Sequence, residues 1–131
     1  GLDYGMKPPV ESFAQGNTRT HFIAQIETME AVSNLQEICS VDGLSGIFIG
    51  PGDLAVSMGR AGQMADPELR DSVVSCIEKA SKAGKLSGIF ILPGPLLSAA
   101  MDAGCDLVMC GGDVMDLGKA WTSLLETIPL K

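Results

Sequence analysis

The sequence Leu-Ser-Gly-Ile-Phe-Ile occurs twice in this chain, at residues 44–49 and again at 86–91. Both copies are almost continuous apolar runs, which is typical of strands that are buried in a parallel sheet. Repetition at a period of about 40 residues indicates that one supersecondary unit is repeated along the chain. The repeat therefore predicts a parallel sheet, since parallel neighbours need a long crossover between them.

Helical segments separate the expected strands, which lie at 21–27, 44–49, 86–91 and 106–112. Thr28 and Asp66 stand where helix caps are expected, Pro95 begins a further helix, and Asp113 is expected to cap the last one. Gly84 and Gly104 are expected to end helices. Three segments carry apolar residues at helical spacing: Val32, Leu35, Ile38 and Cys39; Leu69, Val73, Ile77 and Ala80; and Met115, Leu117, Trp121, Leu124 and Ile128.

A strand followed by a helix, four times over, predicts an α/β fold with a helix-covered parallel sheet. Two architectures fit this order: an open doubly wound sheet, or part of a (β/α)8 TIM barrel. A complete barrel needs roughly 200–250 residues, and this chain has 131. A four-stranded slice of a barrel would have two open edges and would need a partner to close it.

The charge and composition exclude several classes of protein. The net charge of −7 argues against nucleic-acid and anionic-membrane binding, which favour basic chains. No apolar run approaches the roughly 20 residues of a membrane span. The four cysteines lack zinc-site spacing, so we expect reduced, buried thiols in a cytoplasmic protein.

Two acidic residues follow consecutive expected strands. Glu27 ends the first strand, and Asp53 comes just after the second. Sites in parallel α/β proteins lie at the carboxyl ends of strands, and neighbouring strands are about 4.8 Å apart, so both carboxylates could reach one ion. Two hard oxygen ligands suit Mg²⁺ or Mn²⁺. A role as a helix cap explains Asp53 equally well. It does not explain Glu27, because Thr28 is the better cap of the following helix.

Other residues near these acids suggest substrate contacts. Gln25 shares a face with Glu27, because side chains two apart in a strand point the same way. Gly50-Pro51-Gly52 could present backbone N–H groups to a carboxylate or phosphate, although the segment is neither a Walker loop nor a dinucleotide fingerprint. The single histidine, His21, is expected at the opposite end of the first strand, which leaves the site without an obvious base.

Several motifs together resemble the HpcH/HpaI family of metal-dependent class II pyruvate aldolases. They are QIET at 25–28, GIFIGPGDL at 46–54 and Ser-x-Gly at 57–59, and the resemblance extends over about residues 20–128. It implies a (β/α)8 barrel of which residues 20–131 form the carboxy-terminal half, about strands 5–8. Residues 1–19 would then be a linker or short helix left from the preceding barrel unit.

The resemblance also implies a function and a set of site residues. The reaction would be aldol cleavage or condensation of a 2-keto-3-deoxy or 4-hydroxy-2-keto acid, giving pyruvate and an aldehyde through a metal-bound pyruvate enolate. Glu27 and Asp53 would bind Mg²⁺ or Mn²⁺, with Co²⁺ as a further candidate. Gln25 and the backbone N–H groups of Gly52 and Asp53 would contact the substrate, and Phe90 would shape the aldehyde pocket.

The sequence departs from the family pattern in one respect. The family's histidine base and substrate-binding arginine lie on early strands, which this chain lacks, so no residue here is assigned as catalytic. The expected partners are the amino-terminal half-barrel and further copies in a homo-oligomer, with neither nucleic acid nor membrane. The alternatives are a CoA-ester lyase of the citrate-lyase-β or malyl-CoA type, and a non-catalytic half-barrel that binds a ligand or assembles with a partner.

Overall fold

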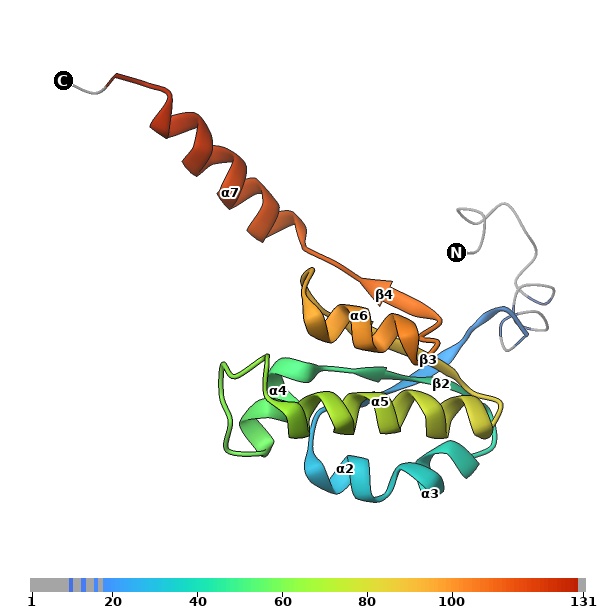
Figure 1. The fold of residues 1–131 in the computed structure, drawn as a ribbon. Coiled ribbons are helices and arrows are strands. Elements are labelled where there is room, and N and C mark those ends of the chain that lie inside the picture. The colour runs from blue at the N-terminus through green and yellow to red at the C-terminus, as the bar shows by residue number, and fades with distance from the viewer. Residues whose placement is uncertain (1–9, 11–12, 14–15, 17, 130–131) are drawn as a thin grey trace.

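The computed structural model describes residues 10, 13, 16 and 18–129 (Figure 1). Four strands alternate with helices along the chain. The strands are β1 (Phe22–Ile26), β2 (Leu44–Ile49), β3 (Leu86–Phe90) and β4 (Leu107–Met109). The helices are α2 (Met29–Ser33), α3 (Leu35–Ser40), α4 (Pro51–Ser57), α5 (Pro67–Lys82), α6 (Pro95–Asp102) and α7 (Asp113–Glu126).

The four strands form one sheet in the order β1-β2-β3-β4, and every neighbouring pair is parallel. The register pairs Ile26 with Ile49 and Ile49 with Ile89. The carboxyl ends of all four strands therefore lie at the same end of the sheet. This confirms the α/β class and the parallel sheet that the repeated strand–helix order predicts.

The core lies between the sheet and the helices α3, α5 and α6. Ile47, Ile49 and Ile89 are almost fully buried there, against the apolar side of α5. Strand residues on the other face, such as Phe48 and Phe90, are only half-buried. The sheet thus has one covered face and one open face, as expected of a slice of a barrel. The buried α5 residues are Leu69, Val73, Cys76, Ile77 and Ala80.

Local signals explain where most helices begin and end. Thr28 caps α2 by accepting a hydrogen bond from the Ala31 N–H, and Asp66 caps α5 by accepting from the Glu68 and Leu69 N–H groups. Gly84 follows α5 with φ +67°, a left-handed conformation that ends helices cheaply only for glycine. These positions agree with the predicted caps and stop signals.

Several details differ from the sequence-based expectations. Strand β4 covers only Leu107–Met109 of the strand expected at 106–112. The helix expected after β1 is interrupted at Asn34 and forms two short helices, α2 and α3. Helix α4 begins at Pro51, before the start that Asp53 as its cap would give, because proline already has a helical φ at the first position. Asp113 is the first residue of α7 and not its cap; Gly112 occupies the cap position.

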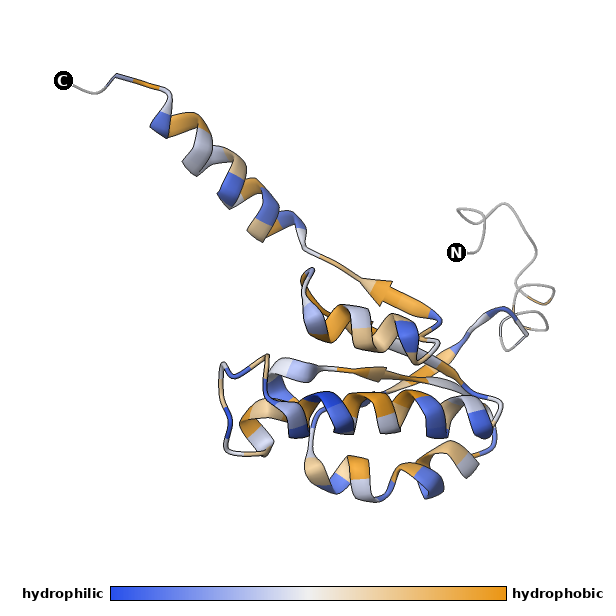
Figure 2. Cartoon of the chain, in the orientation of Figure 1, coloured by the Kyte–Doolittle hydropathy of each residue, from blue (hydrophilic) through white to orange (hydrophobic). Residues whose placement is uncertain are grey.

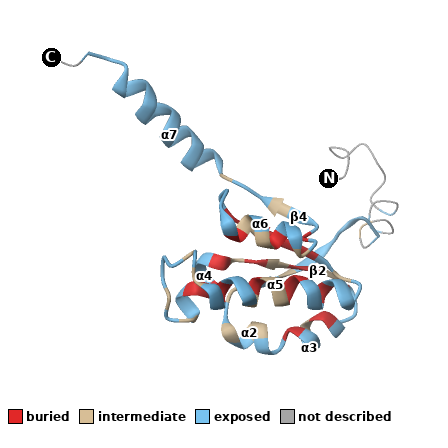
Figure 3. Cartoon of the chain, viewed as in Figure 1, coloured by how far each residue is buried: buried red, intermediate tan, exposed pale blue. Residues whose placement is uncertain are grey.

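Helix α7 extends away from the rest of the described chain (Figure 1). Its apolar stripe was expected to be buried, yet every residue of the helix is exposed (Figure 3). Figure 2 shows apolar and polar residues alternating along its length. Nothing in the described part of the chain covers the apolar side chains, among them Val114, Leu117, Trp121, Leu124 and Leu125.

Most of the segment 1–19 lies outside the described residues, and so does most of the predicted linker or short helix. Its described positions 10, 13, 16, 18 and 19 have helical backbone. Within the described residues, the longest helices are too short and too polar to cross a membrane.

Replacing Asp66 should weaken the start of α5. Its carboxylate accepts the two helix N–H groups and also pairs with Arg60 at 2.9 Å. We expect Asp66→Ala to lower the free energy of unfolding by about 1–2 kcal/mol, measured by urea denaturation. Asp66→Asn is the matched control, because it keeps the capping oxygen and should lose less than about 1 kcal/mol. Equal losses in the two variants would contradict the capping role.

The cysteines should differ sharply in reactivity. Burial raises the pKa of the Cys39, Cys76 and Cys105 thiols, that of Cys76 to about 11, whereas Cys110 is exposed. We expect iodoacetamide at pH 8 to modify Cys110 quickly and the other three only after unfolding, as read by mass spectrometry. Rapid modification of Cys76 in the folded chain would contradict this burial.

The raised pKa of the Cys76 thiol predicts a pH dependence of stability. Because the folded pKa of Cys76 is raised above the ordinary value of 9.0, its contribution to stability is complete below pH 9. It is lost as the pH rises from 9 toward 11, and thermal melts across this range should show the fall.

Candidate metal and substrate site

Strands β1 and β2 bring Glu27 and Gly50 side by side. Ile26 pairs with Ile49 at the ends of the two strands, and the Gly50 N–H donates to the Ile26 carbonyl at 3.1 Å. Glu27 is the first residue after β1, and Gly50 the first after β2. The register therefore places the Glu27 side chain beside Gly50, three residues before Asp53.

The Glu27 carboxylate has a defined position. The Gln25 amide Nε2 donates to Glu27 Oε1 at 2.5 Å, which confirms that the two side chains share a face. The residue is half-buried, and a Cβ built on Gly50 would lie 2.7 Å from the same Oε1. None of the described residues donates a hydrogen bond to Oε2. Oε1 thus has a protein donor, whereas Oε2 has none among the described residues.

Asp53 lies in the first turn of α4, three residues after the N-cap Gly50. Its side chain is exposed, and no described residue pairs with its carboxylate. The interpretation of Asp53 as the cap of α4 is therefore wrong. An acid in the first turn still interacts favourably with the helix dipole, but it keeps both oxygens for other partners.

The donor chemistry of these two acids fits a hard divalent cation. Mg²⁺ and Mn²⁺ prefer carboxylate oxygens and commonly take only one or two from the protein, with water or substrate completing the octahedron. Within the described residues, no group of three or more His, Cys, Asp and Glu side chains is placed to hold a metal ion. Glu27 and Asp53 have the donor atoms that a Mg²⁺ site retaining water would need.

Backbone N–H groups accompany Asp53 at the start of α4. Leu54 makes the first intrahelical hydrogen bond, to the Gly50 carbonyl at 2.9 Å, and Pro51 has no N–H. The N–H groups of Gly52 and Asp53 therefore precede the helical ladder, as the first donors of any helix do. Gly52 is exposed, with open space around its Cα.

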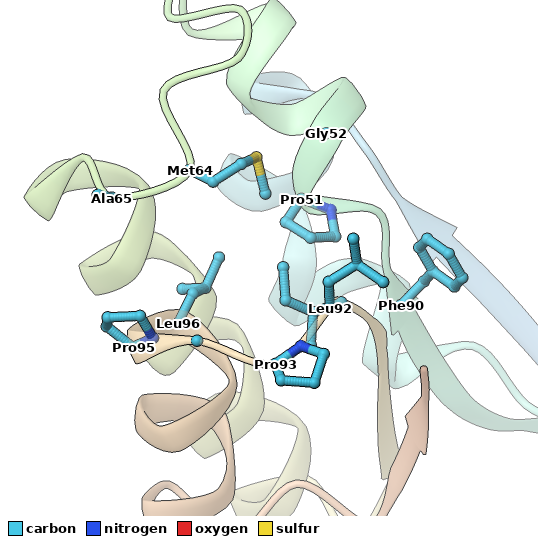
Figure 4. A pocket seen from close by; sticks show the side chains of 11 residues that line it. Pro51, Gly52, Met64, Ala65, Phe90, Leu92, Pro93, Pro95 and Leu96 are labelled. Carbon is cyan, nitrogen blue, oxygen red and sulfur yellow. The ribbon is translucent and has the colours of Figure 1, made fainter. Parts of the chain in front are cut away.

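An apolar cavity of about 380 Å³ adjoins this turn (Figure 4). Two of the predicted substrate-contacting residues, Gly52 and Phe90, line it. Among the described residues, no ionisable side chain lines the cavity. The sequence did not single out Met64, which lies in a loop without any pattern, or Leu96, which has the pattern of an ordinary core residue. The lining residues are Pro51, Gly52, Met64, Ala65, Phe90, Ile91, Leu92, Pro93, Gly94, Pro95 and Leu96.

The basic residues near the sheet are engaged elsewhere. His21 lies at the amino end of β1, with Nδ1 3.3 Å from the Ser45 Oγ, so its predicted place opposite the site is confirmed. Arg60 pairs with Asp66 and Glu68, and the Lys85 Nζ donates to the Leu44 carbonyl at 2.7 Å. The described residues therefore offer no histidine and no unpaired arginine beside Glu27.

Two curated relatives cover most of the chain. The hydroxypyruvate/pyruvate aldolase of Cupriavidus necator is 40% identical over 93 residues, which are 71% of this chain and 35% of that protein. The 4-hydroxy-2-oxo-heptane-1,7-dioate aldolase of Salmonella paratyphi C is 38% identical over 110 residues, or 84% of this chain and 42% of that protein. The chain thus spans less than half the length of these relatives.

A solved structure supports the architecture. The HpcH/HpaI aldolase from Desulfitobacterium hafniense DCB-2 superposes with a TM-score of 0.83 and 26% identity, covering all of this chain and 52% of that one. This confirms the prediction that the four strand–helix units are part of a TIM-barrel fold, about half of it, and not an open doubly wound sheet.

The family model for HpcH/HpaI aldolase/citrate lyase matches residues 5–120. That match includes β1 to β4, Gln25, Glu27, the Gly50–Asp53 turn and Phe90. With the relatives and the shared fold, it establishes that the chain belongs to the HpcH/HpaI aldolase/citrate lyase family.

Proposed function

We propose that this chain supplies the metal-binding half of a class II aldolase that cleaves a 4-hydroxy-2-keto or 2-keto-3-deoxy acid into pyruvate and an aldehyde. The supporting observation is the pair of carboxylates at the ends of β1 and β2, neither of which pairs with a cation among the described residues. The relatives' activities, named for pyruvate and hydroxypyruvate or for a hydroxy-oxo-heptanedioate, match this chemistry.

Glu27 and Asp53 would hold the divalent cation, Mg²⁺ or Mn²⁺. A bound cation of this kind supplies Lewis-acid stabilisation of the negative charge that develops on the keto oxygen. The chain's own part is to fix the ligands in place: Gln25 holds one oxygen of Glu27, and the first turn of α4 presents Asp53.

The remaining site residues would orient the keto acid. The N–H groups of Gly52 and Asp53 would donate to the substrate carboxylate, because they precede the helical ladder and lie at the positive end of α4. Gln25 keeps its second amide hydrogen and its carbonyl oxygen for the substrate. Phe90 would border the aldehyde, beside an apolar cavity that would exclude water from the reacting atoms.

Activity would require a second half-barrel. The open face of the sheet and its two edges expose apolar side chains that a barrel would cover, among them Phe22, Leu107 and Met109. The base and the arginine that the resemblance implies would come from that half. The exposed apolar side of α7 would contact another copy in a homo-oligomer.

A Mn²⁺ titration with oxalate, which mimics the pyruvate enolate, tests the proposed ligands. We expect oxalate to strengthen Mn²⁺ binding to the wild-type chain, and Glu27→Gln or Asp53→Asn to weaken it at least about 10-fold, because each removes a charged oxygen ligand. Glu30→Gln, an exposed acid in the first turn of α2, is the control and should bind like wild type.

Complementation separates an enzyme from a binding module. The chain is mixed with a separately produced amino-terminal half of the Salmonella relative and assayed for pyruvate release. Metal-dependent release would support the aldolase. Tight Mn²⁺ binding without cleavage of any keto acid would favour a non-catalytic half-barrel, and cleavage of CoA esters alone would favour the CoA-ester lyase.

Charged residues on α7 should disrupt self-association. We expect Trp121→Asp with Leu124→Asp to lower the mass measured by analytical ultracentrifugation, because both side chains are more than half exposed on a helix that the described chain leaves uncovered. Lys119→Gln, on the same helix, should leave the mass unchanged. A wild-type chain that is monomeric at all concentrations would contradict the proposed oligomer.

A further inference from the structure

We propose that Gly50 is a positioning residue for the Glu27 carboxylate: the space left by its missing side chain is where the Glu27 side chain lies. The inference rests on the proposed function only in taking Glu27 as a metal ligand. The contact itself stands on the geometry of the two strand ends.

The distances leave no room for a methyl group. A Cβ on Gly50 would be 2.7 Å from Glu27 Oε1, 2.9 Å from its Cγ and 3.2 Å from its Cδ. Carbon atoms in contact are normally about 3.5–4.0 Å apart. Any other residue at position 50 would therefore have to displace the Glu27 side chain or the backbone of the turn.

The backbone of the turn is the more strongly held of the two. The Gly50 N–H donates to the Ile26 carbonyl at 3.1 Å, and its own carbonyl accepts from Leu54 at 2.9 Å. The neighbours Ile49 and Pro51 are both buried. The Glu27 side chain is only half-buried and rotates about single bonds, so it would move first.

Backbone torsion does not require glycine here. Gly50 has φ −100° and ψ 85°, and its negative φ avoids the left-handed region where a side chain is strained. The requirement for glycine comes from the space that Glu27 occupies. This separates Gly50 from Gly84 and Gly104, which have positive φ.

Displacing Glu27 would change its ligand geometry. Oε1 accepts from the Gln25 amide and lies close to Gly50, whereas no described residue donates to Oε2. A shift away from Gly50 would disturb the Gln25 hydrogen bond and move both oxygens. Mg²⁺ demands a near-ideal octahedron, so small displacements of a ligand cost affinity. Groups that orient a ligand typically contribute 10–100-fold to metal affinity.

A double-mutant cycle on thermal stability tests the contact without any metal. We expect Gly50→Ala to lower the melting temperature by up to about 5 °C, because the half-buried Glu27 side chain has to rotate away. The same change should have little effect in a Glu27→Ala background, where the clashing side chain is gone. Gly46→Ala is the matched control: its methyl would lie 2.5 Å from the Leu86 carbonyl, so Glu27→Ala should not rescue it. An equal loss from Gly50→Ala in both backgrounds would overturn the proposal.

Mn²⁺ affinity, measured from free Mn²⁺ by electron paramagnetic resonance, tests the consequence. We expect at least about 10-fold weaker binding in Gly50→Ala, and unchanged binding in Gly118→Ala, where the methyl would meet nothing within 4 Å. Wild-type affinity in Gly50→Ala would overturn the positioning role.

Two further outcomes are decisive as well. If Gly50→Ala does not fold, a folded double variant with Glu27→Ala supports the proposal, and an unfolded one overturns it. If the wild-type chain binds no Mn²⁺, this chain does not form the proposed metal site unaided, and the stability cycle still decides whether Glu27 is what Gly50 accommodates.

Discussion

The in-register parallel pairing of β1 with β2 is the constraint on which the candidate site depends. The hydrogen bond from the Gly50 N–H to the Ile26 carbonyl closes the pairing at the carboxyl ends of both strands. It places the Glu27 side chain against the first turn of α4. A shift of one residue in this register would turn Gln25 and Glu27 toward the helices. The site is therefore a consequence of strand pairing as much as of its own residues.

The same sheet explains why the described chain is incomplete as a barrel. The face of the sheet toward the helices holds a continuous apolar core. On the opposite face, Phe48 and Phe90 are only half-buried and Gln25 is exposed. In a closed barrel this face lines the interior, where side chains from all strands pack in layers. The candidate ligands therefore sit where two halves would meet, and the base is expected from across that boundary.

The sequence patterns predicted most helices and strands, but they did not predict what covers each of them. The repeated strand, the Asp66 cap and the glycine stops gave correct boundaries because each acts within a few residues. Asn34 broke a helix that its apolar stripe predicted as continuous, and α7 is exposed despite its amphipathic pattern. A stripe shows which side of a helix tends to be buried, but it does not show what covers it.

By itself, the sequence determined the order of elements, the parallel sheet and the two acids at neighbouring strand ends, because propensity, capping and hydrophobic pattern are local properties. Only the tertiary structure decided that Gln25 holds one oxygen of Glu27, that Gly50 gives Glu27 its space, and that Met64 and Leu96 enclose a cavity beside Gly52. The Gln25–Glu27 bond lies at one strand end, where the sequence predicted a shared face. The other contacts join residues from different elements, and their distances follow from strand register and helix packing, which no local pattern encodes.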